Sequence, residues 1–193
     1  MVSQLKVNEI ITQSGSTLTL GQSGDTINAA SGVSANFAGV KMADLWRQNA
    51  DTAISAATET VLASNWEQAD TDSFGVIGSA MTQSSGIFTF PETGIYLVIF
   101  NCQIHSPSQG ATYAGGIIQT TTDNGTYSNA AEGYNSIYHS NGYGIVTIYH
   151  KFDVTSTSTH KVKFVANCEF ASDVRGNTGY NRTCSQFIRL GDT

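Results

Sequence analysis

The sequence predicts an all-β sandwich, and three observations support this fold class. Runs of aromatic and β-branched residues recur along the chain, for example at residues 145–154 and 160–170. The segments between such runs are dense in Gly, Ser and Asn, which favour turns. No segment has the periodicity of a long helix. Strands at regular intervals, separated by turn signals and without long helices, are typical of a sandwich.

Residues 86–100 carry the strongest strand signal. Pro91 and Gly94 bracket a four-residue turn between two runs of aromatic and β-branched residues, which predicts a strand, a tight corner and a second strand. The second run, residues 95–100, is apolar without alternation and indicates a strand covered on both faces. Because a lone antiparallel sandwich leaves one face of each sheet in water, this run predicts a neighbouring subunit on the far side.

The start of the chain predicts an attachment segment. Residues 1–12 alternate polar and apolar side chains and indicate a short strand. We expect this strand to dock on a larger assembly or to pair between subunits, through Leu5, Val7, Ile10 and Ile11.

A small internal repeat follows the attachment segment. Gln-Ser-Gly at 13–15 and 22–24, and Ala-Ser-Gly at 30–32, recur at spacings of nine and eight residues. The strand-like blocks between them hold too few apolar residues to form a core alone. Three chains winding into a short β-shaft over residues 13–40 would bury them, and the alternative is a Gly/Ser-rich linker.

The remainder, residues 41–193, predicts the head domain. Residues 41–50 fit either a helix or a first strand, and residues 61–67 indicate the next strand. Trp66 is expected in the core or in a subunit contact. Further strands are expected at 101–105, 113–121, 145–154 and 160–170, with long loops at 122–144 and 172–183.

The composition and charge of the chain argue against nucleic-acid binding. Of the 193 residues 12% are charged, against about 25% in an ordinary domain, while 40% are hydrophobic. The formal net charge is -6, and the nine Lys and Arg residues are scattered, so we expect no nucleic-acid partner. Ser, Thr, Asn and Gly replace the missing charges, a mixture common in β-structured fibres.

The cysteines and the apolar runs indicate the compartment. Cys102, Cys168 and Cys184 are three in number and lack CxxC spacing, which favours buried free thiols, although a bridge between Cys102 and Cys168 stays open. No apolar run reaches the roughly 18 residues that span a bilayer, and a signal peptide is absent from the first residues. We therefore expect synthesis in a cytoplasm without export and no membrane insertion.

No pattern in the sequence predicts catalysis, a cofactor or a metal site. Glu67, Asp70 and Asp72 cluster after Trp66 and could in principle serve as glycosidic acid and base, or as weak calcium ligands. A loop of three acidic residues beside Gly and Ser is more often a solvated turn or a weak set of calcium ligands than a catalytic pair. The four histidines lack metal-ligand spacing, and His150 is expected to be structural. We expect a protein that is not an enzyme.

Tyrosines in the polar loops are the sharper functional signal. Tyr combines a large contact area with little loss of side-chain entropy, and antibody binding loops use the same mixture of Tyr, Ser, Gly and Asn. The candidate receptor-binding residues, for a host glycan or surface protein, are Tyr127, Tyr134, Tyr138, Tyr143 and Tyr180. Packing between strands or subunits is the alternative role of each ring.

The central stretch resembles a known family. Gly86-x-Phe88-x-Phe90-Pro91-x-x-Gly94-x-Tyr96 is similar to the signature of the complement-1q-type, TNF-like jelly-roll head, and residues 187–193 resemble the ending of marine phage virion proteins that carry such a head. The resemblance covers residues 41–193. It implies a ten-stranded jelly roll that trimerises about a threefold axis, makes residues 41–50 a strand, and brings no catalytic residues. The expected core or trimer residues are Trp66, Phe88, Phe90, Tyr96, Val98 and Phe100.

These inferences predict a trimeric virion protein of a bacteriophage. Residues 1–40 would bind another virion protein, and the head at 41–193 would adhere to the host as a tail-fibre or appendage knob. The main alternative is a trimeric capsid-decoration or head-fibre protein without a receptor role. A free lectin-like head and a depolymerase are further alternatives.

Overall fold

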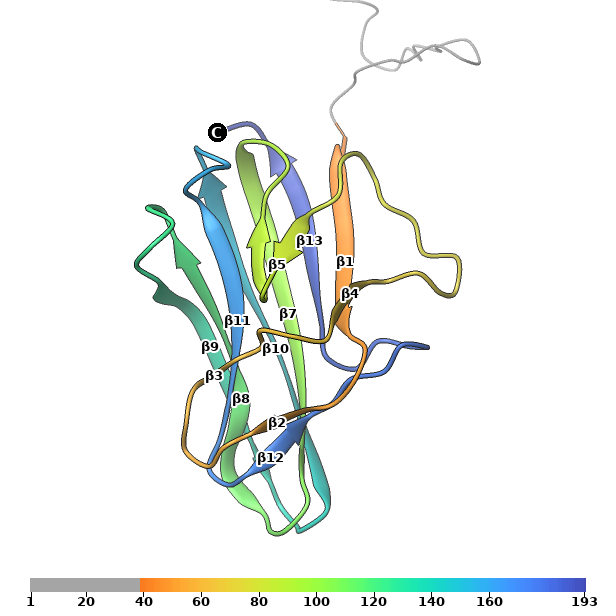
Figure 1. The fold of residues 1–193 in the computed structure, drawn as a ribbon, viewed down its shortest axis with the longest axis vertical. Coiled ribbons are helices and arrows are strands. Elements are labelled where there is room, and N and C mark those ends of the chain that lie inside the picture. Colours follow the sequence, from red (N-terminus) through yellow and green to blue (C-terminus); the bar gives the residue numbers. More distant parts are fainter. Residues whose placement is uncertain (1–38) are drawn as a thin grey trace, which may run out of the picture. The chain divides into compact units, whose positions relative to one another are not determined.

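The computed structural model describes residues 39–193, which form thirteen strands and no helix (Figure 1). The expected all-β fold is confirmed. Residues 42–48 are a strand, so the helix alternative for residues 41–50 is wrong. The predicted attachment and shaft segment, including Leu5, Val7, Ile10 and Ile11, lies outside the described residues except for residues 39 and 40.

Seven strands form the first sheet around β7 (Gly94–Ser106). β7 pairs antiparallel with β10 (Gly142–Val154) on one side and with β13 (Cys184–Gly191) on the other. The sheet continues from β13 through β1 (Met42–Gln48) to β4 (Trp66–Gln68). Two short strands, β12 (Ser172–Val174) and β2 (Thr52–Ile54), extend it from the last residues of β7.

Six strands form the second sheet, in the order β5 (Thr82–Ser84), β6 (Ile87–Thr89), β11 (Lys161–Cys168), β8 (Ala111–Thr121) and β9 (Ser128–Ile137). The short β3 (Thr60–Val61) also pairs with β11. All pairings in both sheets are antiparallel.

The corner at residues 90–93 carries the chain from one sheet to the other. β6 belongs to the second sheet and β7 to the first, so the two predicted strands are not a hairpin. Gly94 has φ +148°, and a Cβ there would lie 2.4 Å from Arg189 Nε. The glycine therefore allows Arg189, whose Nε donates to Thr93 O at 2.9 Å, to lie against the corner.

Phe88 is the centre of an aromatic core between the sheets. Its ring meets Trp46, Trp66, Phe164 and Phe187 at centroid distances of 5.6, 5.2, 5.4 and 5.2 Å. The six residues expected in the core or in the trimer contact all lie inside this single-chain core: Trp66, Phe88, Phe90, Tyr96, Val98 and Phe100.

β7 contributes to the core with only one of its faces. Tyr96, Val98 and Phe100 are buried against the second sheet, whereas Leu97 and Ile99 point away from the sandwich and are half-buried. The apolar run at 95–100 is therefore covered by the core on one side, and its other side is an apolar surface of the single chain.

Three sequence-based expectations need correction. The loop expected at 122–144 contains β9, and that expected at 172–183 contains β12. Gly, Asn and Ser disfavour strands, but β9 pairs along β8, and at Gly115 a Cβ would lie only 1.9 Å from Gly133 O, so this composition is what close strand packing requires. The single strand expected at 61–67 is two short strands, β3 and β4, in different sheets.

The three cysteines are free thiols, so the bridge left open between Cys102 and Cys168 is not formed. Cys102 Sγ lies 3.8 Å from Gly115 O, and Ser172 Oγ donates to Cys168 Sγ at 3.3 Å. Burial raises the pKa of Cys102 to about 12 and that of Cys184 to about 11. Cys102 and Cys184 therefore stay protonated at neutral pH.

We expect Phe88→Ala to destabilise the head by about 3–5 kcal/mol, because it empties the centre of the aromatic core. Thermal unfolding followed by circular dichroism at fixed protein concentration measures the loss. Tyr138→Ala, at a ring that is 89% exposed, is the control and should leave the melting temperature almost unchanged. Equal effects of the two substitutions would contradict the assigned core.

Candidate functional site

The outer face of the first sheet is divided along its length into two surfaces of different chemistry. In Figure 1 the upper end of the sandwich holds the start of β1 and the C-terminus, and the lower end holds the turns β7–β8 and β9–β10. β7 runs from the upper to the lower end. Its outward residues, with their partners on β10 and β13, therefore set the chemistry of the face row by row.

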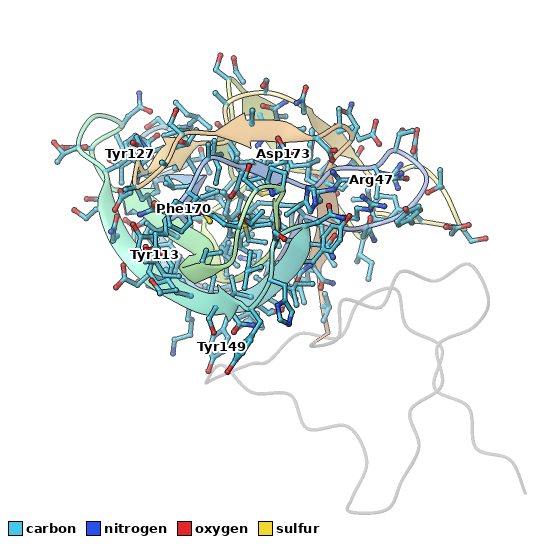
Figure 2. All side chains as sticks on the ribbon, turned by 90° about the horizontal axis from the view of Figure 1, so that it is seen from below. Arg47, Tyr113, Tyr127, Tyr149, Phe170 and Asp173 are labelled. Atoms are coloured by element: carbon cyan, nitrogen blue, oxygen red, sulfur yellow. The ribbon has the colours of Figure 1, made fainter. Side chains whose placement is uncertain are left out.

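The upper rows are mostly apolar. Leu97 pairs with Ile188 on one side and Lys151 on the other, and Ile99 pairs with Gln186 and Tyr149. We call this surface the apolar patch, formed by Leu45, Leu97, Ile99, Tyr149 and Ile188. Tyr149 is 71% exposed and projects from the sandwich in Figure 2.

The lower rows border a pocket of about 420 Å³, which we call the lower pocket. β7 and β10 form its floor, and the segment between β12 and β13 forms its wall. The lining residues are Asn101, Gln103, Tyr143, Ile145, Tyr180, Asn181 and Arg182. The volume falls within the roughly 300–1,000 Å³ typical of small-molecule sites.

Hydrogen bonds fix the wall of the lower pocket to β7. Asn101 Nδ2 donates to Arg182 O at 2.6 Å, and Thr147 Oγ1 donates to Asn101 Oδ1 at 2.9 Å. The backbone N–H of Gln103 donates to Thr183 Oγ1 at 3.1 Å, and this hydroxyl donates to Gln103 O at 3.3 Å. The position of Arg182 is therefore set by the sheet.

The aromatic rings of the lower pocket are also held in place. Tyr143 stacks on His105 at a centroid distance of 4.7 Å, and His105 Nε2 lies 2.8 Å from Asn141 Oδ1. Arg182 Nη2 donates to Tyr180 Oη at 2.6 Å. Tyr143 and Tyr180 line the pocket and are about half exposed, so a ligand in the pocket could contact both rings.

The five candidate tyrosines do not form one site. Only Tyr143 and Tyr180 meet, in the lower pocket. Tyr138 lies on the β9–β10 turn beside a separate hollow of about 340 Å³. Tyr127 and Tyr134 belong to the second sheet and its loops: Lys163 Nζ lies 4.1 Å from the Tyr127 ring centre, and Tyr134 packs edge-on against Tyr113 at 5.9 Å. Figure 2 shows Tyr127 and Tyr149 on different sides of the sandwich.

The acidic cluster surrounds a buried cation. Arg47 is 1% exposed, and its Nε and Nη2 lie 2.7 Å from Glu67 Oε1 and 2.6 Å from Asp70 Oδ1. Arg47 Nη1 donates to Thr71 Oγ1 at 2.9 Å. Two of the three predicted carboxylates are therefore committed to an ion-pair network, and Asp72 is exposed. Among the described residues no group of three or more His, Cys, Asp or Glu could hold a metal ion.

Sequence reasoning missed Gln103, Arg182 and the role of Arg47. Gln103 could have been found, because successive side chains of a strand point to opposite faces, which places Gln103 on the same face as Ile99. Arg182 and Arg47 carry no comparable signal, since their surroundings depend on how distant loops pack on the sheet.

No helix that could cross a membrane occurs in residues 39–193.

The fold is similar to those of solved TNF-like proteins. Murine APRIL aligns over 77% of this chain and 98% of its own, with 15% identity and a TM-score of 0.53. Eiger TNF from S. frugiperda aligns over 80% of this chain and 95% of its own, with 11% identity and a TM-score of 0.60. The vertex protein P5 of PRD1 aligns over 80% of this chain and 99% of its own, with 12% identity and a TM-score of 0.44.

Sequence comparison adds nothing to the structural likeness, because neither a family model nor a curated protein matches the chain. At these identities the structural neighbours establish the fold alone. The head is a TNF-like jelly roll, as the central motif at 86–96 predicts.

The ion pairs of Arg47 should make the head acid-sensitive. Burial raises the pKa of Glu67, but hydrogen bonds from Arg47, Thr178 and Asn49 and the charge of Arg47 outweigh it, so the pKa lies below its ordinary 4.5. A carboxyl whose folded pKa is depressed contributes stability above its unfolded pKa and loses it as the pH falls through the folded value.

We therefore expect the stability of the wild-type head to fall as the pH drops below about 4.5. The Glu67→Gln variant should be less stable at pH 7, and its stability should depend less on pH in the acidic range. Thermal melting between neutral and acidic pH measures both. Asp72→Asn, at an exposed carboxylate, is the matched control. Parallel acid limbs for wild type and Glu67→Gln would contradict the role of the Arg47 network.

Proposed function

We propose that this chain is a homotrimeric virion protein of a bacteriophage whose jelly-roll head adheres to the host surface. The observation that carries the proposal is the division of one sheet face into an apolar patch, suited to self-association, and a lower pocket lined by tyrosine, amide and arginine side chains. The likeness of residues 187–193 to the ending of phage virion proteins supports the location in a virion.

The apolar patch supports association between copies of the chain. Leu97, Ile99 and Ile188 occupy adjacent rows at the centre of the sheet and do not contribute to the single-chain core. Tyr149 extends the patch onto β10 with most of its ring in water. Burying apolar area contributes about 25 cal/mol per Å². Lys151, the pairing partner of Leu97 on β10, is a charged neighbour of the patch. A threefold arrangement would let each copy cover the patch of the next.

The lower pocket supports recognition of an external ligand. It borders the second half of β7 and the first residues of β10, away from the apolar patch. Its two half-exposed tyrosine rings and free amides are groups that binding loops use for glycans and proteins. Tyr138, on the β9–β10 turn, borders a separate hollow and is not part of this pocket.

A binding role without catalysis is also part of the proposal. Two of the three carboxylates that could serve as a glycosidic acid and base, Glu67 and Asp70, pair with Arg47 instead of with each other. A capsid-decoration protein would also be trimeric, but it would not need the lower pocket.

We expect Ile99→Lys to convert the trimer into monomers, because it places an unpaired charge in the centre of the apolar patch. The monomer should stay folded, since Ile99 points away from the core. Sedimentation velocity across a dilution series measures the association, with a shift of at least about tenfold in its midpoint. Thr82→Lys, on the exposed β5, is the control and should remain trimeric. A wild-type monomer at all concentrations would overturn the trimer.

Host adhesion should depend on the tyrosines of the lower pocket and not on those of the second sheet. We expect Tyr143→Ala with Tyr180→Ala to reduce binding of fluorescently labelled protein to host cells by about tenfold or more. The matched pair Tyr127→Ala with Tyr134→Ala removes the same side chains elsewhere and should bind like wild type. A full loss in the second pair and none in the first would reverse the assignment; binding by neither protein nor variants would favour the capsid-decoration role.

A further inference from the structure

We propose that the lower pocket binds a carboxylated sugar, a uronic acid or a related acidic unit, with Arg182 as the ligand of the carboxylate. This inference rests on the proposed host adhesion and names the chemistry that the head would recognise.

Arg182 is the one arginine in the described residues that has no carboxylate partner. Residues 39–193 contain every arginine of the chain, and three of the four form ion pairs: Arg47 with Glu67, Arg175 with Asp51 at 2.7 Å, and Arg189 with Asp192 at 2.6 Å. Arg182 forms no ion pair within this range. It lines the lower pocket, in a chain with a formal charge of -6. Within the described residues one of its five N–H donors is used, in the hydrogen bond to Tyr180.

The surroundings of Arg182 favour a carboxylate over a phosphate or sulfate. The pocket contains one arginine and no lysine, so it offers a single positive charge. A planar guanidinium fork matches the two oxygens of a carboxylate, whereas phosphate sites gather several cations or backbone N–H groups. The remaining donors of Arg182 are sufficient for one bidentate contact.

The rest of the pocket suits a sugar ring. Tyr143, Tyr180 and Ile145 give the pocket apolar surface against which the C–H groups of a pyranose can pack. The tyrosine rings are held by neighbours: Tyr143 stacks on His105, and Arg182 Cζ lies 5.2 Å from the Tyr180 ring centre. The side chains of Gln103 and Asn181 form no hydrogen bond to the described residues and are free to bind sugar hydroxyls. Asn101 differs from them, because both of its side-chain polar atoms are already bonded.

The direct test is an NMR titration of the full-length protein with three acidic sugars: sodium D-galacturonate, sodium D-glucuronate and sodium N-acetylneuraminate. At least one should give saturable shifts of the resonances from Tyr143, Tyr180 and Arg182. D-galactose, which has the galacturonate ring without the carboxylate, and sodium sulfate, which has the charge without the ring, should bind at least about tenfold more weakly, a difference of about 1.4 kcal/mol.

Variants separate the carboxylate contact from general charge. Arg182→Gln should weaken binding of the acidic sugar at least about tenfold, while Arg182→Lys should retain part of it, because lysine keeps the charge but loses the fork. Lys163→Gln, on the second sheet, changes the net charge by the same amount as Arg182→Gln and should bind the acidic sugar like wild type. The inference is overturned if none of the three sugars saturates the pocket, if galactose or sulfate binds as tightly, or if Arg182→Gln binds like wild type.

Cell binding distinguishes a failure of this inference from a failure of the proposed function. If wild-type protein adheres to host cells and neither Arg182→Gln nor free acidic sugar reduces adhesion, the acidic-sugar assignment is wrong and the adhesion proposal stands. If the pocket binds the acidic sugar but the protein does not adhere to cells, the pocket assignment stands and the adhesion proposal is wrong.

Discussion

The pairing of β7 with β10 and β13 is the constraint on which the rest of the structure depends. This long strand contributes Tyr96, Val98 and Phe100 to the core, and the same alternation forces its other residues onto the outer face of the sheet. A register slip of one residue would exchange the two sets, exposing Phe100 and burying Asn101. The register that closes the core therefore also determines the order of the outward rows, from apolar at the upper end to polar at the lower end.

The loops that cover the first sheet depend on polar contacts to its strands. Asp44 is buried, and its carboxylate accepts hydrogen bonds from Trp46 Nε1 at 2.9 Å, Gln68 Nε2 at 2.8 Å and Met81 N at 2.8 Å. Arg47 holds the segment at 67–71 in a similar way. β1 thus anchors both ends of the long loop between β4 and β5, at Gln68 and at Met81. A long loop needs such anchors because it has little apolar surface to bury.

The sequence predicts most strands and the fold class well, because the core residues lie in segments whose own composition favours strands. Phe88, Tyr96 and Phe100 lie in runs whose composition favours strands in any context. β9 was missed because its Gly, Ser and Asn residues favour turns locally, and only its pairing with β8 makes it a strand. The lower pocket was only half predictable: Tyr143 and Tyr180 stood out by composition, whereas the partnership of Arg182 with β7 joins residues 81 positions apart.

The position of Arg182 explains why an unpaired cation can persist in the lower pocket. An arginine that is free to move would turn into water or find one of the fifteen carboxylates of the chain. Here its carbonyl is held by Asn101, its neighbour Thr183 is bonded to Gln103, and its guanidinium is directed by Tyr180. The guanidinium is therefore held without a counter-ion from residues 39–193, and a ligand that supplies a carboxylate would not have to bear the cost of ordering this side chain.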